Sequence, residues 1–415
     1  MRSRKFHSRT PTDTPTSSLH QIPDHRVKPE GVHLYPRAFG ELGLTLLLTI
    51  SVCWSGYTEG RFEITPDVDR LIRSGQLAMY NCDYADANKK FDELVRKFPD
   101  HPVGYMYKAE AVWWKALRDS ANKELGSQFF QYTDQAVRLG EALTKKDPKD
   151  FNAWYFLASA YGNKTRFHVT ITKSYWGAMR SGLKGRYCNE NALALKPSCV
   201  DCLIGTGSFN YFAGALPAVI KPFAWMLGAR GDREKGLKQL EIAAEKGEYG
   251  KTEAKTVLLG VYYNERRFDD YRTLISKLIE QYPTNHVFYM WLANHYISEH
   301  QYDQGIRFFT NLLEGPGIPG ARVSREYGNY ERGRLELQKG APDKAVFSFT
   351  RAIESGEKDK DMLARAHLMR AFALDLKGDR TSALRDYQSV LSLPNVDETQ
   401  KQATRFSKTP YQGRP

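Results

Sequence analysis

The sequence lacks the residue groupings that most enzyme chemistry requires. It contains no Gly-x-Ser-x-Gly, and the Gly228–Gly231 turn is not followed by the Lys-Ser or Lys-Thr pair of a phosphate-binding loop. Glu299 and His300 lack the second His of the zinc-binding helix HExxH, and His295 lies five residues away, on a different helix face. We therefore expect no catalytic residue, no metal site and no cofactor. An enzyme would require a polar cluster assembled in a groove from distant parts of the chain.

Long hydrophobic runs are also scarce. Residues 42–54 carry no charge, but 13 residues match a secretory signal core better than a membrane span, which needs about 20. The segment before it is rich in Ser, Thr, Pro, His and Arg and is predicted to be disordered. We expect residues 1–56 to be a leader and the protein to be exported, periplasmic or envelope-associated. The alternatives are a single-pass membrane anchor, an apolar first helix packed on the fold, or a translation start further along the chain.

Charge of one sign is not concentrated enough to indicate nucleic acid. The 60 basic and 48 acidic residues give a net charge of +12, and the first 37 residues hold seven of the basic and three of the acidic ones. After residue 60 no dense run of Lys and Arg is interleaved with aromatic residues. We interpret most of these charges as solvated and expect no nucleic-acid partner.

What the sequence does contain is a recurring helical stripe. In residues 150–161, Trp154, Leu157, Ala158 and Tyr161 fall on one face of a helix, with a small residue at the centre where a second helix can dock closely. Similar stripes recur along the chain, and several end in a proline that stops the helix. The pattern predicts helix pairs stacked in a row.

This spacing resembles the first helix of the tetratricopeptide repeat family, W-x2-L-G-x2-Y, with Ala158 in the glycine position. The resemblance covers roughly residues 67–392. It implies an all-α, tetratricopeptide-type α-solenoid of about eight helix pairs, a noncatalytic scaffold that binds a protein or peptide. We expect repeats over 65–314, a turn-rich break after Glu314, further repeats over 321–393, and a polar tail over 394–415 that frays at its end.

A second resemblance covers the 31 residues from Asn210 to Leu240. This stretch is similar to uncharacterised exported bacterial tetratricopeptide proteins, and to a eukaryotic tetratricopeptide family of inclusion-body and lipid-droplet clearance. It implies a helical scaffold without catalytic residues. Residues 218–228 within it are apolar apart from Lys221, and we interpret them as a core plug, since long exposed apolar surfaces invite aggregation. A docking patch, or lipid contact in a membrane-associated protein, is the alternative.

In tetratricopeptide superhelices the first helices line a concave groove, one turn away from the packing stripe. The resemblance therefore implies a peptide-binding groove lined by residues of three such helices, with packing between helices as the alternative for each residue. The predicted groove residues are Tyr155, Ser159, Met290, Asn294, Tyr327, Tyr330 and Arg334.

Three of the five cysteines lie within fifteen residues. Cys199 and Cys202 form a CxxC without the His of a haem attachment site, and no second CxxC is present for zinc. In an exported protein, Cys188 could bridge to Cys199 or Cys202 and link the third repeat to the fourth. A redox-active CxxC and reduced core cysteines are the alternatives.

The leader generates the first prediction. N-terminal sequencing of the protein recovered from its native compartment is expected to show a mature chain that begins close to Ser55 or Gly56. A chain that keeps residues 42–54 and sediments with membranes would instead establish the anchor.

Overall fold

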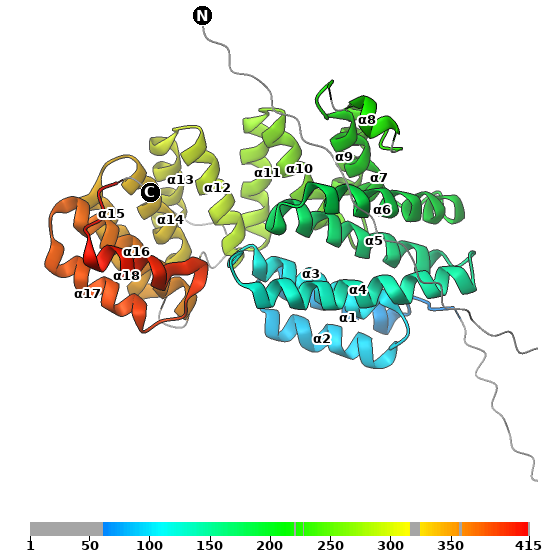
Figure 1. Cartoon of the computed structure of the whole chain (residues 1–415), viewed down its shortest axis with the longest axis horizontal. Helices are drawn as coiled ribbons and strands as arrows, with labels where there is room; N and C mark the ends of the chain where they lie inside the picture. Colours follow the sequence, from blue (N-terminus) through cyan, green and yellow to red (C-terminus); the bar gives the residue numbers. More distant parts are fainter. Residues whose placement is uncertain (1–60, 220, 227, 316–323, 357–358, 414–415) are drawn as a thin grey trace, which may run out of the picture. The chain divides into compact units, whose positions relative to one another are not determined.

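A computed structural model describes residues 61–415 except 220, 227, 316–323, 357–358 and 414–415 (Figure 1). The described residues belong to one compact unit, and all of their regular structure is helical, which confirms the predicted all-α class. None of the helices in these ranges is both long and apolar enough to cross a bilayer. The predicted signal or anchor at 42–54 lies outside the described residues, as does most of the break predicted after Glu314.

Within the described ranges the helices form eight pairs, each packed across a turn, and these make the tetratricopeptide-type α-solenoid that the sequence predicts. The pairs are α1 (Pro66–Tyr80) with α2 (Tyr84–Lys97), α3 (Pro102–Ala116) with α4 (Lys123–Lys146), α5 (Phe151–Phe167) with α6 (Tyr175–Leu195), α7 (Cys202–Gly214) with α9 (Arg233–Lys246), α10 (Lys251–Asn264) with α11 (Phe268–Gln281), α12 (His286–Ser298) with α13 (Tyr302–Glu314), α14 (Arg325–Gln338) with α15 (Pro342–Ser355), and α16 (Lys360–Lys377) with α17 (Arg380–Leu391). Four further elements are η1 (His168–Thr172), α8 (Lys221–Met226), η2 (Val396–Glu398) and α18 (Thr399–Lys408).

Small residues at the helix crossings let the two helices of a pair approach closely. Gly75 and Gly333 each face a phenylalanine sixteen residues further on, Phe91 and Phe349. A Cβ at Gly333 would lie 2.7 Å from the Phe349 ring, which is closer than carbon atoms pack. The same glycine and phenylalanine spacing in the first and seventh pairs is direct structural evidence for the repeat.

Helix α3 is buried on almost all of its faces, because it packs on distant helices as well as on its partner. Twelve of its fifteen residues are buried. The Trp114 ring centroid lies 5.6 Å from that of Phe288 and 6.1 Å from that of Trp291, both on α12. Tyr80, at the end of α1, packs on Tyr282 and accepts a hydrogen bond at its carbonyl from Asn285 Nδ2 at 2.8 Å. The first two pairs therefore contact the fifth and sixth directly.

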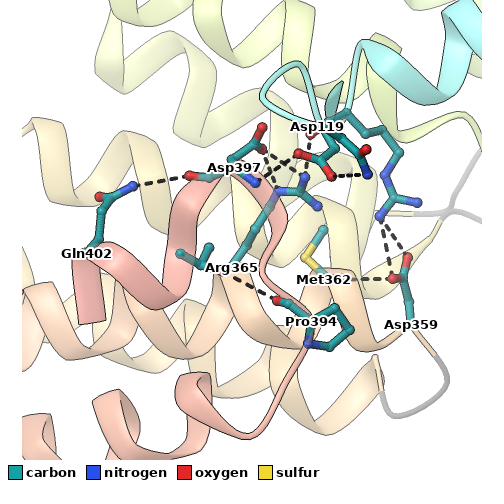
Figure 2. Close-up of polar contacts among 10 residues, drawn as sticks. Asp119, Asp359, Met362, Arg365, Pro394, Asp397 and Gln402 are labelled. Carbon is teal, nitrogen blue, oxygen red and sulfur yellow. Dashed lines mark hydrogen bonds and ion pairs between the residues drawn. The ribbon is translucent and has the colours of Figure 1, made fainter. Parts of the chain in front are cut away.

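The turn after α3 reaches further along the chain, to the last pair (Figure 2). Arg118 Nη2 donates to Asp359 Oδ2 at 3.1 Å, and Arg365 donates to the Arg118 carbonyl. Arg365 Nη2 also donates to Asp397 Oδ2 at 2.8 Å, while Asp397 N donates to Asp119 Oδ1 at 3.1 Å. Asp397 has a φ of 47°, a left-handed conformation that costs energy for a residue with a side chain, and these contacts hold it there. We call this set of contacts the clasp.

The polar tail packs on the last repeat. Helix α18 buries Ala403 and Phe406, and beyond it the Tyr411 ring stacks on Phe372 with centroids 4.2 Å apart. Tyr411 N donates to Asp375 Oδ2 at 2.8 Å. The expectation that residues 409–415 fray is therefore wrong for Tyr411, because an aromatic ring in an otherwise polar stretch finds an apolar partner.

The core plug predicted for residues 218–228 is not found. Val219 is 76% exposed, Trp225 49% and Met226 79%. Helices α7 and α9 pack directly on each other at Gly207, where a Cβ would lie 3.1 Å from Leu240, so the segment between them is not needed to fill their crossing. The segment stands outside the stack, where α8 lies beyond the end of α7 (Figure 1).

The clasp generates the second prediction. Arg365→Ala removes charge-assisted hydrogen bonds to Asp397 and to the Arg118 carbonyl, and is expected to lower the free energy of unfolding by about 2 kcal/mol, measured by urea denaturation. Lys401→Ala removes an exposed ion pair with Glu398 in the same region. We expect this variant to change the free energy of unfolding by less than about 0.5 kcal/mol. Equal effects of the two variants would show that the clasp adds no stability.

Candidate functional site

A cavity of about 680 Å³ lies beyond the end of α3, between α5, α6, α7 and α10. We call it the α5–α10 cavity. Its volume is in the range of small-molecule and side-chain binding sites. Most of its wall is apolar and rich in aromatic side chains, namely Trp113, Tyr155, Phe209, Phe212, Tyr263, Tyr271 and Trp291.

Arg166 is the charged group at the wall of this cavity that is held most firmly. Its guanidinium carbon lies 4.0 Å from the Trp113 ring centroid, and its Nη1 lies 3.3 Å from Glu253 Oε1. Its Nη2 donates to Asn163 and lies 3.8 Å from Glu110 Oε1. Arg166 Nε and Nη1 are buried and make no hydrogen bond with the described residues. Nη1 has the Glu253 carboxylate as its ionic partner, and the buried Nε has no acceptor among the described residues, which costs stability.

Glu110 supports Arg166 from below. It is 3% exposed, and Tyr80 Oη donates to Glu110 Oε1 at 3.4 Å. Burial raises the pKa of Glu110 from 4.5 to about 7, Arg166 opposes this shift, and Glu253 adds to it. Near neutral pH the carboxyl can therefore take up a proton while it remains buried.

Asp201 joins three elements at the edge of the cavity. Its carboxylate accepts hydrogen bonds from Glu248 N and Tyr249 N, both at 2.8 Å, and from Tyr155 Oη at 3.4 Å. It thereby fixes the turn before α10 to the turn before α7 and to α5. The wall is therefore built from elements that lie far apart in sequence. The hydrogen bonds of the Asp201 carboxylate hold these elements together.

Two glycines on facing walls keep the cavity open. Gly162 on α5 and Gly260 on α10 both line it, and a Cβ at either position would have no atom within 4 Å. Glycine inside a helix costs roughly 0.5 to 1 kcal/mol relative to alanine, and packing does not require it here. Glycine at these two positions therefore makes the helices less stable than alanine would, and leaves space in the cavity.

The structure brings only two of the predicted groove residues to this cavity. Tyr155 and Ser159 line it. Met290 is half-buried against the core, and Asn294 is exposed and accepts a hydrogen bond from Arg334 Nη2 at 2.8 Å. Arg334 is also paired with Glu331. None of these three lines the α5–α10 cavity.

Tyr327 and Tyr330 do not face an open groove, contrary to the prediction. They are 7% and 9% exposed. Tyr327 donates a hydrogen bond to Asp359, and the guanidinium of Arg118 lies 5.8 Å from its ring centroid. The end of α3 and its turn occupy the space that an open solenoid would leave for a peptide.

The predicted disulfide through Cys188 is also wrong. Cys199 and Cys202 are bonded to each other, with their Cα atoms 5.4 Å apart. Cys188 is a free, buried thiol in the same apolar cluster, and burial raises its pKa to about 12. The bond closes the turn before α7 and does not link it to α6.

The reasoning from sequence missed Arg166, Glu253, Gly162 and Gly260. Arg166 lies in the last turn of α5, outside the stripe that carries the repeat signal, so repeat spacing gives it no role. The glycines carried a usable signal, since a helical glycine away from the crossing has no packing reason. Among the residues that the structure describes, no three His, Cys, Asp or Glu side chains are grouped so as to hold a metal ion.

The paired helices and the cavity between them define a helical-repeat protein with a candidate binding site. No protein-family model matches the sequence, and no curated protein matches it. Among solved structures, the chain is similar to yeast Tom70, with 13% identity and a TM-score of 0.33 over 83% of this chain and 82% of that one. A tetratricopeptide repeat protein from Parabacteroides merdae has 12% identity and a TM-score of 0.31, over 83% of this chain and 100% of that one. The human IFIT1 dimer with PPP-AAAA has 16% identity and a TM-score of 0.38, over 79% of this chain and 72% of that one. TM-scores this low do not assign a function to this chain. Its fold class is given by its own helix pairs.

The buried carboxyl generates the third prediction. A carboxyl whose pKa is higher in the folded than in the unfolded chain binds more protons when folded, so stability falls as the pH rises from about 4.5 to about 7. Glu110→Gln is expected to remove this component, which is at most about 3 kcal/mol, from unfolding free energies measured between pH 5 and 8. Glu280→Gln, at an exposed position on α11, should leave the pH dependence of wild type. Parallel curves for all three proteins would contradict the assignment.

Proposed function

We propose that this chain is a noncatalytic helical-repeat scaffold that is exported to the cell envelope and holds a segment of a partner protein in the α5–α10 cavity. The observation that carries the proposal is the cavity itself, with its aromatic walls and the Arg166 guanidinium among its lining groups. A peptide segment offers both complements, since its apolar side chains bury against the rings and its carbonyl oxygens accept from the guanidinium.

The proposal of a noncatalytic role is supported by the chemistry of the lining. No His or Cys is among the lining residues. Asp201 is engaged with two backbone amides, and Glu253 is paired with Arg166. These groups serve to build and orient the wall, which suits a binding site better than proton transfer or nucleophilic attack.

Export is supported by the sequence of residues 42–54 and by the Cys199–Cys202 disulfide, because such bonds persist in oxidising compartments. The envelope is the compartment that combines an oxidising environment with a cleaved signal in a bacterial protein. The sequencing of the mature N-terminus described above tests this part of the proposal separately from the cavity.

The cavity generates the fourth prediction. Peptides selected from a random display library against wild type are expected to bind Gly162→Leu and Gly260→Leu at least about tenfold more weakly, because each leucine fills the cavity without meeting the protein. Affinity is measured by fluorescence anisotropy, and folding of each variant is checked by circular dichroism.

Gly126→Leu is the matched control. Gly126 is also helical and also has no atom within 4 Å of a Cβ, but it lies on α4 and does not line the cavity. It should bind the selected peptides like wild type. If the two cavity variants also bind like wild type, the cavity is not the site that holds the peptide.

A further inference from the structure

The excess positive charge of the described chain is gathered in one segment. Residues 164–230 contain nine Lys or Arg and two Asp or Glu, a net +7 out of the +12 of the whole chain. The first 37 residues carry +4, so the remainder of the chain is nearly neutral. Sequence reasoning missed this concentration, because the basic residues are spread over several helices and form no run.

The same segment carries most of the exposed large apolar side chains. Of the fifteen that are exposed among the described residues, nine lie in 164–230, which is less than a fifth of the described chain. On α6 and α8 they include Tyr175 at 75%, Trp176 at 67%, Trp225 at 49% and Met226 at 79% exposure. Exposed apolar groups gathered in this way mark an interaction surface.

Shared cavity walls and hydrogen bonds connect the parts of this surface. Lys173 and Phe212 both line the α5–α10 cavity, so the turn before α6 and the end of α7 border the same space. Arg186 of α6 lines the cavity too, and its Nη1 lies 3.3 Å from the carbonyl oxygens of Gly228 and Arg230, to which it donates. The segment that carries α8 is thereby held against α6. We call the surface that carries Lys173, Tyr175, Trp176, Phe212, Val219, Lys221, Trp225, Met226 and Arg230 the α8 surface.

The cations of the α8 surface are not neutralised by the protein. Lys173, Lys221 and Arg230 have no acidic partner among the residues that the structure describes. Elsewhere on the same helices the cations are paired, as Lys184 is with Glu141 and Arg186 with Glu190. Lys221 and Arg230 therefore lie in the same short segment as the exposed Val219, Trp225 and Met226, and no described carboxylate neutralises them.

We propose that the α8 surface docks on an anionic lipid bilayer. Trp and Tyr are the side chains that favour the membrane interface, and Lys and Arg are attracted by anionic headgroups. The aliphatic Val219 and the flexible Met226 gain by entering the acyl region, whereas a nucleic acid offers them no comparable environment. Docking of this kind is peripheral and requires no membrane-spanning helix. It goes beyond the peptide-binding function and does not depend on it.

The test is flotation of the full-length chain with phosphatidylcholine vesicles that contain about 30% phosphatidylserine, at about 0.1 M salt. Trp225→Ser with Met226→Ser, and separately Lys221→Glu with Arg230→Glu, are expected to lower the partition coefficient at least about tenfold. Residues 42–54 are present in every protein, so their contribution to membrane binding is constant.

Two matched double variants serve as controls. Leu77→Ser with Phe347→Ser removes apolar side chains of comparable exposure on α1 and α15, and Lys89→Glu with Lys277→Glu makes the same charge change on α2 and α11. Both should stay within about twofold of wild type. If test and control variants bind alike, the α8 surface is not the docking surface. If wild type binds pure phosphatidylcholine vesicles equally well, anionic lipid is not the partner.

Two further measurements keep the assignments apart. Gly162→Leu and Gly260→Leu should retain vesicle binding, so a loss of peptide binding in those variants leaves the lipid proposal standing. A single-stranded oligonucleotide that binds wild type, loses affinity in the charge-reversed variant and prevents flotation would overturn the choice of lipid in favour of nucleic acid.

Discussion

The packing of α3 against α12 is the contact on which the other features depend. Each of its large aromatic side chains, Trp114 foremost, contributes on the order of 2 to 3 kcal/mol by leaving water, and together they hold the early pairs against the later ones. Because the turn after α3 lies at the seventh pair, Arg118 covers Tyr327. Because α3 ends near Leu117, the space beyond it is left unfilled and becomes the α5–α10 cavity.

At the wall of that cavity, buried polar groups hold the Arg166 guanidinium in place. Glu110, Asn163 and Glu253 surround the guanidinium of Arg166 and the Trp113 ring stacks on it, so its orientation is fixed. A side chain restrained in this way loses little entropy when it binds an acceptor. The acidic neighbours also limit how strongly Arg166 attracts a fully charged anion, which suits a neutral carbonyl as its acceptor.

The helix pairs, their number and the N-caps at Asp232 and Asp379 could be predicted from the sequence, because helical spacing and capping are local properties. The filling of the concave side could not be predicted from repeat spacing, which describes only neighbouring helices. A signal existed in the composition of α3 and α12, which are apolar around their circumference, since such helices are buried on all sides. The cavity depends on contacts such as Asp201 with the turn before α10, about 47 residues apart, and no local pattern encodes them.

An open solenoid can gain or lose a repeat at little cost, because each unit contacts only its neighbours. In this chain the clasp joins the turn after α3 to Asp359 and Asp397, across several intervening pairs. Duplication of any pair between them would displace one side of the clasp by the width of a whole repeat and separate Arg118 from its partner. The number of repeats between the two sides of the clasp is thus fixed by geometry, whereas an insertion such as α8, which lies outside the stack, leaves the clasp undisturbed.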